Sequence, residues 1–361
     1  MRTSAWGFVE PCKKCSKLEL FTAPYVIWGT GRVAQAFYRT YCAPEGKKPI
    51  FWVDSNAAKH GSRIAGIEVV APETFYQHSE DIYAKGGRLS VVIGATGIFL
   101  LEILSLLERR MVKAAVYSAV QLDAACYFSA EYARIEKIVQ KFSDEKSRHI
   151  YRSLIANMKS GRPVDFSLYE PNQYFGNDVI GELARGEVFV DAGVCHGEEI
   201  DRAIHGGGIF VHGFEPDAEN YAYLLKKYEG RDDVRIHPCA LWDKDERLVF
   251  QSNAATPSAS RLAGADAHEE AAGIAARPLD DVLQGAACTL LKMDIEGAEY
   301  NALLGAAKTI EQHRPKLAVC VYHSLEDYVR IPELLMERYP FYRFFLRQHS
   351  ATSGETVLYA L

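Results

Sequence analysis

The sequence predicts an α/β protein with two doubly wound modules, each a parallel sheet with helices on both faces. In both halves of the chain, short apolar runs typical of buried strands alternate with amphipathic helical segments. Each half also contains a strand that leads directly into a glycine-containing turn. The length of 361 residues suits two domains of ordinary size.

Composition and charge limit the classes of protein to which the chain can belong. Hydrophobic residues make up 48% of the chain and charged residues 24%, which excludes a disordered protein. The net charge of -6 argues against a general nucleic-acid binder. The apolar run from Ile98 to Leu107 is interrupted by Glu102 and is too short to span a membrane, and no secretory signal is visible. We therefore expect a cytoplasmic enzyme or binding protein.

The first module carries the fingerprint of a dinucleotide-binding turn. A strand at residues 25–28 precedes Gly29 and Gly31 in a G-x-G-x-x-A pattern, and a second strand ends at Asp54. In such sites the glycines admit the phosphates and the acid binds a ribose. These residues predict a Rossmann-like domain over residues 1–120. It would bind a nucleotide or nucleotide-sugar, bind NAD(P), or act as a scaffold or dimer platform.

A charged helical stretch at residues 121–168 separates the two modules. Ile135, Ile138 and Val139 recur at helical spacing and form an apolar stripe. This pattern predicts a connector that packs the domains together or forms the face of a homo-oligomer.

The second module, residues 169–361, contains seven strand-like runs. The last two are joined through Ser353 and Gly354 and predict a closing antiparallel hairpin. The stretch from Ala254 to Ala276 is rich in Ala, Gly and Ser and predicts a loop or an insertion with some helix. The strand-like runs are residues 188–191, 209–215, 234–237, 289–294, 317–322, 342–346 and 356–361.

The turn after the first of these strands suits a cationic ligand. Asp191 ends the strand, and Gly193 and Gly197 let the backbone turn sharply and approach a ligand. Glu215 ends the next strand, where it could accept hydrogen bonds from a ribose diol. The glycine spacing is wider than in a pyrophosphate turn, and an acid lies inside the turn. S-adenosylmethionine, with an amino group and a sulfonium, fits this charge pattern, and NAD does not.

A second group of titratable residues lies near the end of the chain. Asp294 follows a buried strand, so its carboxylate is expected in the crevice beyond the strand ends. Glu296 could share that crevice or simply complement a helix dipole. His323 follows the next strand, as a general base or as a structural histidine. Asp294, Glu296 and His323 could also gather around a divalent metal ion, although no spacing establishes such a site.

The cysteines indicate no metal site by their spacing. Cys12 and Cys15 form a lone C-x-x-C without the further ligands that zinc requires. Cys239, Cys288 and Cys320 lie in apolar strand-like runs, where free cysteine behaves as a small buried hydrophobe.

Short motifs run in order through residues 169–361. They are Gln173-Tyr174-Phe175, VFVDAGVCHGEE, GFEPDAENY, the Cys239-Ala240-Leu241 step, RPLDDVL, LLKMDIEGAEYNALLGA, PKLAVCVYHSLEDYVRIPELL and ETVLYAL. Together they resemble the FkbM-type S-adenosylmethionine-dependent methyltransferases. The resemblance implies a C-terminal class I methyltransferase domain with a seven-stranded sheet, preceded by the smaller Rossmann-like domain and the helical connector.

The same resemblance implies a set of site residues. Those implied to bind the methyl donor are Asp191, Gly193, Gly197, Glu215, Ala240, Asp243, Tyr174 and Ser260. Tyr174 would form a lid over the donor or pack in the core, and Ser260 would approach from a loop. Asp294 would lie beneath the sulfonium and the acceptor. His323, which is a candidate through its position after a strand and not through the resemblance, is the second candidate catalytic residue. Cys195 departs from the residues usual in the family's glycine loop.

The segment FWVDSNAAKHGSRIAGIEVV in the first module resembles the N-terminal domain of sugar acyltransferases, which holds a nucleotide-sugar. The resemblance of the second module to FkbM-type enzymes, which often belong to surface-polysaccharide or natural-product pathways, implies the leading expectation: an enzyme that methylates an oxygen of a carbohydrate or other small hydroxylated metabolite in such a pathway. The alternatives are an NAD(P)-dependent oxidoreductase that uses Gly29, Gly31 and Asp54, and a non-enzymatic nucleotide-sensing protein.

Overall fold

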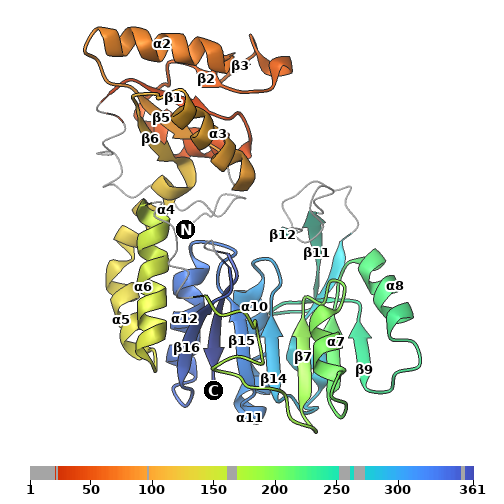
Figure 1. The fold of residues 1–361 in the computed structure, drawn as a ribbon. Helices are drawn as coiled ribbons and strands as arrows, with labels where there is room; N and C mark the ends of the chain where they lie inside the picture. The colour runs from red at the N-terminus through yellow and green to blue at the C-terminus, as the bar shows by residue number, and fades with distance from the viewer. Residues whose placement is uncertain are drawn as a thin grey trace. The chain divides into compact units, whose positions relative to one another are not determined.

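The computed structural model divides the chain into two compact units (Figure 1). Unit 1 comprises Met1–Tyr132 and Ile155–Arg162, and unit 2 comprises Ala133–Leu154 and Pro163–Leu361. The structure describes residue 21 and residues 23–95, 97–160, 169–251, 261–263, 273–350 and 354–361. No helix within these described residues is long and apolar enough to cross a membrane.

Unit 1 is a Rossmann-like sheet with the strand order β3-β4-β2-β1-β5-β6. Its strands are parallel except for the pair β3 and β4. Its elements are β1 (Tyr25–Trp28), α1 (Arg32–Phe37), a π-helix (Tyr38–Cys42), 3-10 turns (Ala43–Glu45 and Ala57–Lys59), β2 (Trp52–Val53), β3 (Arg63–Ile64), β4 (Ile67–Val70), α2 (Pro72–Ala84), β5 (Ser90–Ile93), α3 (Gly97–Arg109), β6 (Ala115–Ser118) and α4 (Ala119–Ala130).

The central strand β1 is buried along its whole length because its side chains enter two cores. Tyr25 and Ile27 pack in a cluster with residues of α1 and α4, whereas Val26 and Trp28 pack with residues of α2 and α3. Successive side chains of a strand point to opposite faces. A strand of four apolar residues is thus what a sheet covered on both faces requires.

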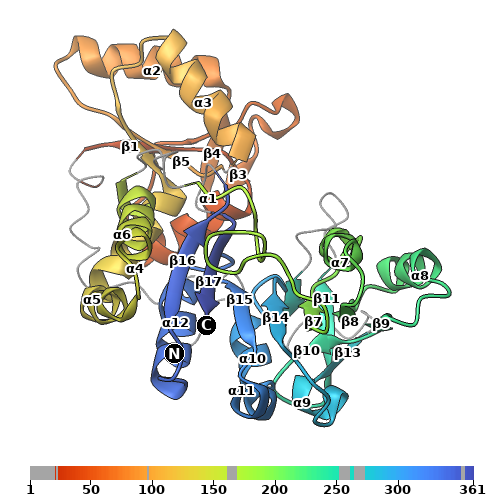
Figure 2. The same cartoon turned by 60° about the horizontal axis from the view of Figure 1, so that its bottom comes forward.

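Unit 2 contains the seven-stranded sheet that the sequence predicts, in the order β16-β17-β15-β14-β7-β8-β9 (Figure 2). In this sheet β17 runs antiparallel to both of its neighbours, which confirms the closing hairpin, and the other pairs are parallel. The elements are β7 (Val188–Ala192), α7 (Glu198–Ile204), β8 (Phe210–Phe214), α8 (Ala218–Lys227), β9 (Val234–His237), β14 (Leu290–Met293), α10 (Glu299–Leu304), α11 (Ala307–His313), β15 (Lys316–Cys320), α12 (Asp327–Arg338), β16 (Phe344–Gln348) and β17 (Thr356–Ala360).

The helices of unit 2 cover both faces of this sheet. Figure 2 shows α7 and α8 on one side and α10 and α11 on the other. The segment after β14 forms two short helices, α10 and α11, because Gly305 interrupts it. A Cβ at Gly305 would lie 1.9 Å from the carbonyl oxygen of Trp242, so the backbone of Trp242 is too close to position 305 to admit any side chain there.

A smaller sheet, β10-β13-β11-β12, lies between β9 and β14 in the sequence. It is formed by β10 (Ala240–Leu241), β11 (Glu246–Gln251), β12 (Arg261–Ala263) and β13 (Ile274–Arg277), and α9 (Leu279–Leu283) follows it. The prediction of a loop, or of an insertion with some helix, over Ala254 to Ala276 is therefore wrong in its secondary structure for the described residues of that stretch. They are strands, whose pairing partners in β10 and β11 are distant enough in sequence to leave no local pattern.

Residues of the predicted connector form α5 (Tyr132–Lys141) and α6 (Glu145–Ser160). The boundaries between the two units fall within these helices. Arg347 of β16 binds the start of α6 to the sheet of unit 2. Its guanidinium lies 2.7 Å from Asp144 and from Asp178 and donates to the hydroxyl of Ser147 at 3.0 Å. The side chain of Arg347 is buried, so these contacts supply its charge compensation.

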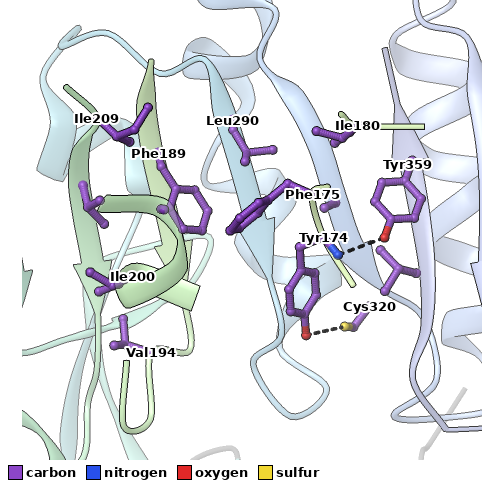
Figure 3. Close-up of a cluster of buried hydrophobic side chains, with 14 of the residues drawn as sticks. Tyr174, Phe175, Ile180, Phe189, Val194, Ile200, Ile209, Leu290, Cys320 and Tyr359 are labelled. Carbon is purple, nitrogen blue, oxygen red and sulfur yellow. Dashed lines mark hydrogen bonds between the residues drawn. The ribbon is translucent and has the colours of Figure 1, made fainter. Parts of the chain in front are cut away.

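The core of unit 2 extends to the segment before β7 (Figure 3). Tyr174 and Phe175 pack against strand residues that include Phe189 and Leu290. The backbone N–H of Tyr174 donates to the hydroxyl of Tyr359 at 3.0 Å. The segment is thereby held against the sheet, with the ring of Tyr174 directed toward the ends of the strands.

Candidate functional site

The candidate site lies at the carboxyl ends of β7 and β14, where the strand order of the sheet reverses. Ligands of open α/β sheets bind at such a switch point. Gly193, just after β7, has φ +85°, and a Cβ there would lie 1.9 Å from the carbonyl oxygen of Asp294. Glycine is therefore required at position 193. The contact brings together two motifs that are about a hundred residues apart in the sequence.

A buried ion pair supports this junction. Lys292 and Asp191 are opposite each other in β14 and β7, and Nζ of Lys292 lies 2.9 Å from Oδ1 of Asp191. The same ammonium donates to the carbonyl of Gly193 at 2.8 Å. Burial lowers the pKa of Lys292, but Asp191, Asp294 and Glu199 outweigh burial and raise it, so Lys292 stays cationic. It neutralises a fully buried carboxylate and fixes the turn.

Glu215, at the end of β8, binds the turn after β7. Its Oε2 accepts the backbone N–H of Cys195 at 2.8 Å, and its Oε1 accepts that of Asp217 at 2.9 Å. Burial raises the pKa of Glu215 by more than these two amides lower it. Each carboxylate oxygen retains a second lone pair. Glu215 can thus hold the turn and accept ribose hydroxyls together.

Gly197 and α7 complete the turn. Gly197 has φ +83°, and a Cβ there would lie 2.3 Å from the hydroxyl of Tyr228. That hydroxyl donates to the carbonyl of Gly197 at 2.9 Å. The first turn of α7 contains Glu198, Glu199 and Asp201. Asp201 forms an ion pair with Lys227 at 2.6 Å, and the other two acids repel a phosphate and suit a cationic ligand.

Asp294 is surrounded by proton donors. Its Oδ2 accepts from the hydroxyl of Tyr174 at 2.7 Å, and its Oδ1 accepts from the hydroxyl of Tyr322 at 3.2 Å. Burial raises the pKa of Asp294, but His323, Lys292 and Tyr174 hold it well below its usual range. The carboxylate is therefore fully charged, and its side chain is 23% exposed, so a ligand can reach it. Tyr174 is buried and also lies in the core, the second of its two predicted positions.

His323 lies between carboxylates. Its Nδ1 is 3.0 Å from Glu299, and its Nε2 is 3.3 Å from Asp294 and 3.7 Å from Glu296. Burial lowers the pKa of His323, but Glu299 and Asp294 outweigh burial and raise it to about 11. The ring is cationic at neutral pH, whereas a general base must be neutral. The geometry thus favours the structural alternative, in which His323 joins the loops after β14 and β15.

Among the residues that the structure describes, atoms of a kind that bind metal ions lie within 4.8 Å of one another in Asp294, Glu299 and His323. Glu299 stands where the sequence suggested Glu296. Both ring nitrogens of His323 face carboxylates, and a protonated imidazole does not bind metals. The imidazolium already compensates the two carboxylates, so the donor set does not fit a metal ion.

The other predicted donor-site residues are placed as follows. Ala240 is buried in β10, three residues beyond β9, and Asp243 is exposed just after β10. Ser260 lies outside the described residues, as do Cys12 and Cys15. The buried, free thiols that the sequence predicts are confirmed for Cys239, Cys288 and Cys320.

The fingerprint of unit 1 has a different environment. Gly29 has φ +101°, as a tight turn requires, and a Cβ at Gly31 would meet no atom within 4 Å. Asp54, however, accepts the hydroxyl of Thr30 and forms an ion pair with Lys59 at 3.0 Å. The acid that would bind a ribose in a dinucleotide site is thus neutralised by a lysine of this chain. This pairing weighs against the NAD(P) alternative.

Sequence reasoning missed three residues of the site, Lys292, Tyr322 and Glu355. A lysine inside an apolar strand signals a buried ion pair, so Lys292 could have been found. Tyr322 and Glu355 gave no signal, because only the fold brings the hydroxyl of Tyr322 to 3.2 Å from Asp294 and to 3.3 Å from the carboxylate of Glu355.

Comparison with known proteins identifies the domain. Residues 191–349 match the family model of the methyltransferase FkbM domain. A crystal structure of methyltransferase FkbM from Methylobacillus flagellatus KT is similar over 99% of this chain and 95% of that chain, with a TM-score of 0.64 and 20% identity. Identity this low shows the fold alone, and the match includes both units. Among curated proteins, none matches the sequence significantly.

Two further solved structures are similar to unit-sized parts of the chain. An rRNA methylase from Streptococcus thermophilus covers 50% of this chain and 87% of its own, with 12% identity and a TM-score of 0.32. Aeropyrum pernix fibrillarin with bound S-adenosyl-L-methionine covers 51% and 70%, with 11% identity and a TM-score of 0.34. These scores are too low to support an argument. Residues 191–349, a little under half of the chain, are thus similar to the methyltransferase FkbM domain, and the seven-stranded sheet that the sequence predicts is present around them.

Proposed function

We propose that unit 2 transfers a methyl group from S-adenosylmethionine to an oxygen of a carbohydrate or other small hydroxylated metabolite. The observation that carries the proposal is the junction of Gly193 with Asp294 at the switch point of the FkbM domain. It gathers the acids of two motifs at the edge where ligands bind. A sulfonium and an ammonium are the charges that such a site favours.

In this proposal the donor lies along the turn after β7. Glu215 accepts the two ribose hydroxyls, and the turn from Gly193 to Gly197 lies against the methionine half. Asp294 lies beneath the sulfonium. Because the donor supplies the electrophile, the protein's main task is to hold acceptor oxygen, methyl carbon and sulfur in line.

Calorimetric titration of the full chain with S-adenosylmethionine, S-adenosylhomocysteine and NADH tests the donor. We expect micromolar binding of the two adenosyl ligands. Glu215→Ala removes the acceptor of two hydroxyls, each worth about 1.5–3 kcal/mol in a charged hydrogen bond, and should weaken binding about 100-fold or more. The matched control is Glu219→Ala, an exposed acid in the first turn of α8, which should leave binding unchanged.

Binding of NADH with no response to the adenosyl ligands would contradict the proposal and favour the oxidoreductase. Equal weakening by Glu215→Ala and Glu219→Ala would remove Glu215 from the donor site.

A further inference from the structure

Beside the donor turn, hydrogen bonds join five side chains in a closed ring: Gln173, Tyr174, Asp294, Tyr322 and Glu355. The hydroxyl of Tyr174 donates to Asp294 at 2.7 Å and accepts from Nε2 of Gln173 at 3.0 Å. The same amide donates to Oε2 of Glu355 at 2.9 Å. The hydroxyl of Tyr322 closes the ring, 3.3 Å from both oxygens of Glu355 and 3.2 Å from Asp294.

The sheet topology explains why Glu355 is in this ring. Asp294 and Tyr322 follow the carboxyl ends of β14 and β15. Because β17 is antiparallel to β15, the residue before β17 lies at the same edge. The backbone N–H of Val321 donates to the carbonyl of Thr356 at 3.0 Å, which fixes Glu355 next to Tyr322. The ring therefore lies at the ligand-binding edge of the sheet.

The ring has fewer protons than its carboxylates require. A phenolic hydroxyl carries one proton, so Tyr322 can donate to Asp294 or to Glu355 but not to both. Asp294 also has the hydroxyl of Tyr174 and the cationic His323. Among the described residues, the amide of Gln173 and the hydroxyl of Tyr322 are the side-chain donors to Glu355. Since Tyr322 is shared with Asp294, only the amide of Gln173 donates to Glu355 without competition from Asp294. Glu355 is only partly buried, so a ligand can supply the missing proton donor.

We propose that Glu355 binds the acceptor hydroxyl and takes its proton during methyl transfer. This inference rests on the proposed function. A lone pair of the hydroxyl oxygen forms the new O–CH3 bond, the S–CH3 bond breaks with its electron pair left on sulfur, and the O–H proton passes to the carboxylate of Glu355. The products are the methyl ether, S-adenosylhomocysteine and protonated Glu355. While the acceptor is bound, Tyr322 donates to Asp294, so the carboxylate of Glu355 is available to the acceptor hydroxyl.

The test measures methyl transfer by the full chain from methyl-tritiated S-adenosylmethionine to a pool of UDP-glucose, GDP-mannose, glucose and glycerol. The pool member labelled fastest is then used for kinetics. We expect Glu355→Gln to lower kcat about 100-fold or more, as loss of a proton acceptor does. Its affinity for S-adenosylhomocysteine should change less than about 2-fold, because the donor turn does not contact Glu355. Glu355→Asp keeps a carboxylate and should recover part of the rate.

Two control variants separate this role from a structural one. Glu337→Gln changes an exposed acid on α12 and should keep the full rate. Gln173→Met removes the amide that holds Glu355 but leaves both carboxylates, so its loss of kcat should be far smaller than that of Glu355→Gln.

Glu355→Gln with a kcat within about 3-fold of wild type would overturn the inference. Loss of S-adenosylhomocysteine binding in both variants at position 355 would overturn it too, because it would show that Glu355 supports the fold of the site. If no pool member is labelled while S-adenosylhomocysteine still binds, the inference is overturned for these four acceptors and the donor site stands. Loss of adenosyl binding in the wild-type protein would instead contradict the proposed function.

Discussion

The turn after β1 in unit 1 and the turn after β7 in unit 2 share one backbone plan. Each begins with a glycine of positive φ, Gly29 or Gly193, that packs against the loop after the strand across the switch point. Each is followed by a short helix and by a second strand that leads to a buried acid, Asp54 or Glu215. By backbone alone, the two turns would be taken for the same kind of site.

The charges around the two turns differ. In unit 1 the acid Asp54 is paired with Lys59, and the loop across the switch point begins with Gly94, which has no side chain. In unit 2 the corresponding position holds Asp294, and α7 begins with acids. The same fold can thus present different electrostatic surroundings to a ligand. The side chains, and not the turn, decide which ligand it suits.

The largest expected difference between the units concerns their ion pairs. Lys292→Met leaves the buried carboxylate of Asp191 without its cation and should cost about 3–5 kcal/mol of unfolding free energy. Lys59→Met breaks a pair whose lysine is 44% exposed and should cost less than about 1 kcal/mol. Urea denaturation of the full chain measures both. Similar losses of unfolding free energy in the two variants would show that the buried pair of Lys292 and Asp191 stabilises unit 2 no more than the exposed pair stabilises unit 1.

A second contrast concerns the glycines. Gly193→Ala puts a Cβ on the carbonyl of Asp294 at φ +85°, so we expect a loss of about 2 kcal/mol and at least about 10-fold weaker binding of S-adenosylhomocysteine. Gly31→Ala has open space and a φ of -72°, so its stability should stay within about 0.5 kcal/mol. Denaturation and calorimetric titration report the two effects. Unchanged ligand binding by Gly193→Ala would move the donor away from this turn.

The smallest expected contrast is in acid sensitivity. His349 of unit 2 is buried between the carbonyl of Glu170 and the hydroxyl of Tyr359, and burial lowers its pKa to about 4. The unfolded chain takes up this proton near pH 6.5, so unit 2 should lose stability as the pH falls from about 6.5 to about 4. Burial raises the pKa of Asp54 in unit 1, but Thr30 and Lys59 outweigh burial and lower it, so its contribution is lost only below about pH 4.

Scanning calorimetry at pH 7 and pH 5 tests whether unit 2 loses stability in acid before unit 1 does. The transition of unit 2 should shift to lower temperature at pH 5, and His349→Gln should reduce the shift because the titrating ring is gone. An equal shift in wild type and His349→Gln would assign the acid sensitivity to other groups.

The sequence predicts most of the main fold because local patterns determine it. The seven strands of unit 2 appear as apolar runs, and β1 reads as a strand buried on both faces. The strands of the small sheet β10-β13-β11-β12 were missed, since short strands have little periodicity and their partners are distant in sequence. The break at Gly305 was missed because it depends on a contact with Trp242.

By itself, the sequence determined the α/β class, the two glycine-rich turns and the motifs that contain Asp191, Glu215 and Asp294, because residue type and spacing along the chain carry that information. Only the tertiary structure decided which of these groups form ion pairs and which hydrogen bonds they share. It paired Lys292 with Asp191, placed His323 between carboxylates and brought Glu355 to Tyr322. The physical reason is that pKa values and hydrogen bonds depend on distances of a few ångströms between strands, which the order of residues does not encode.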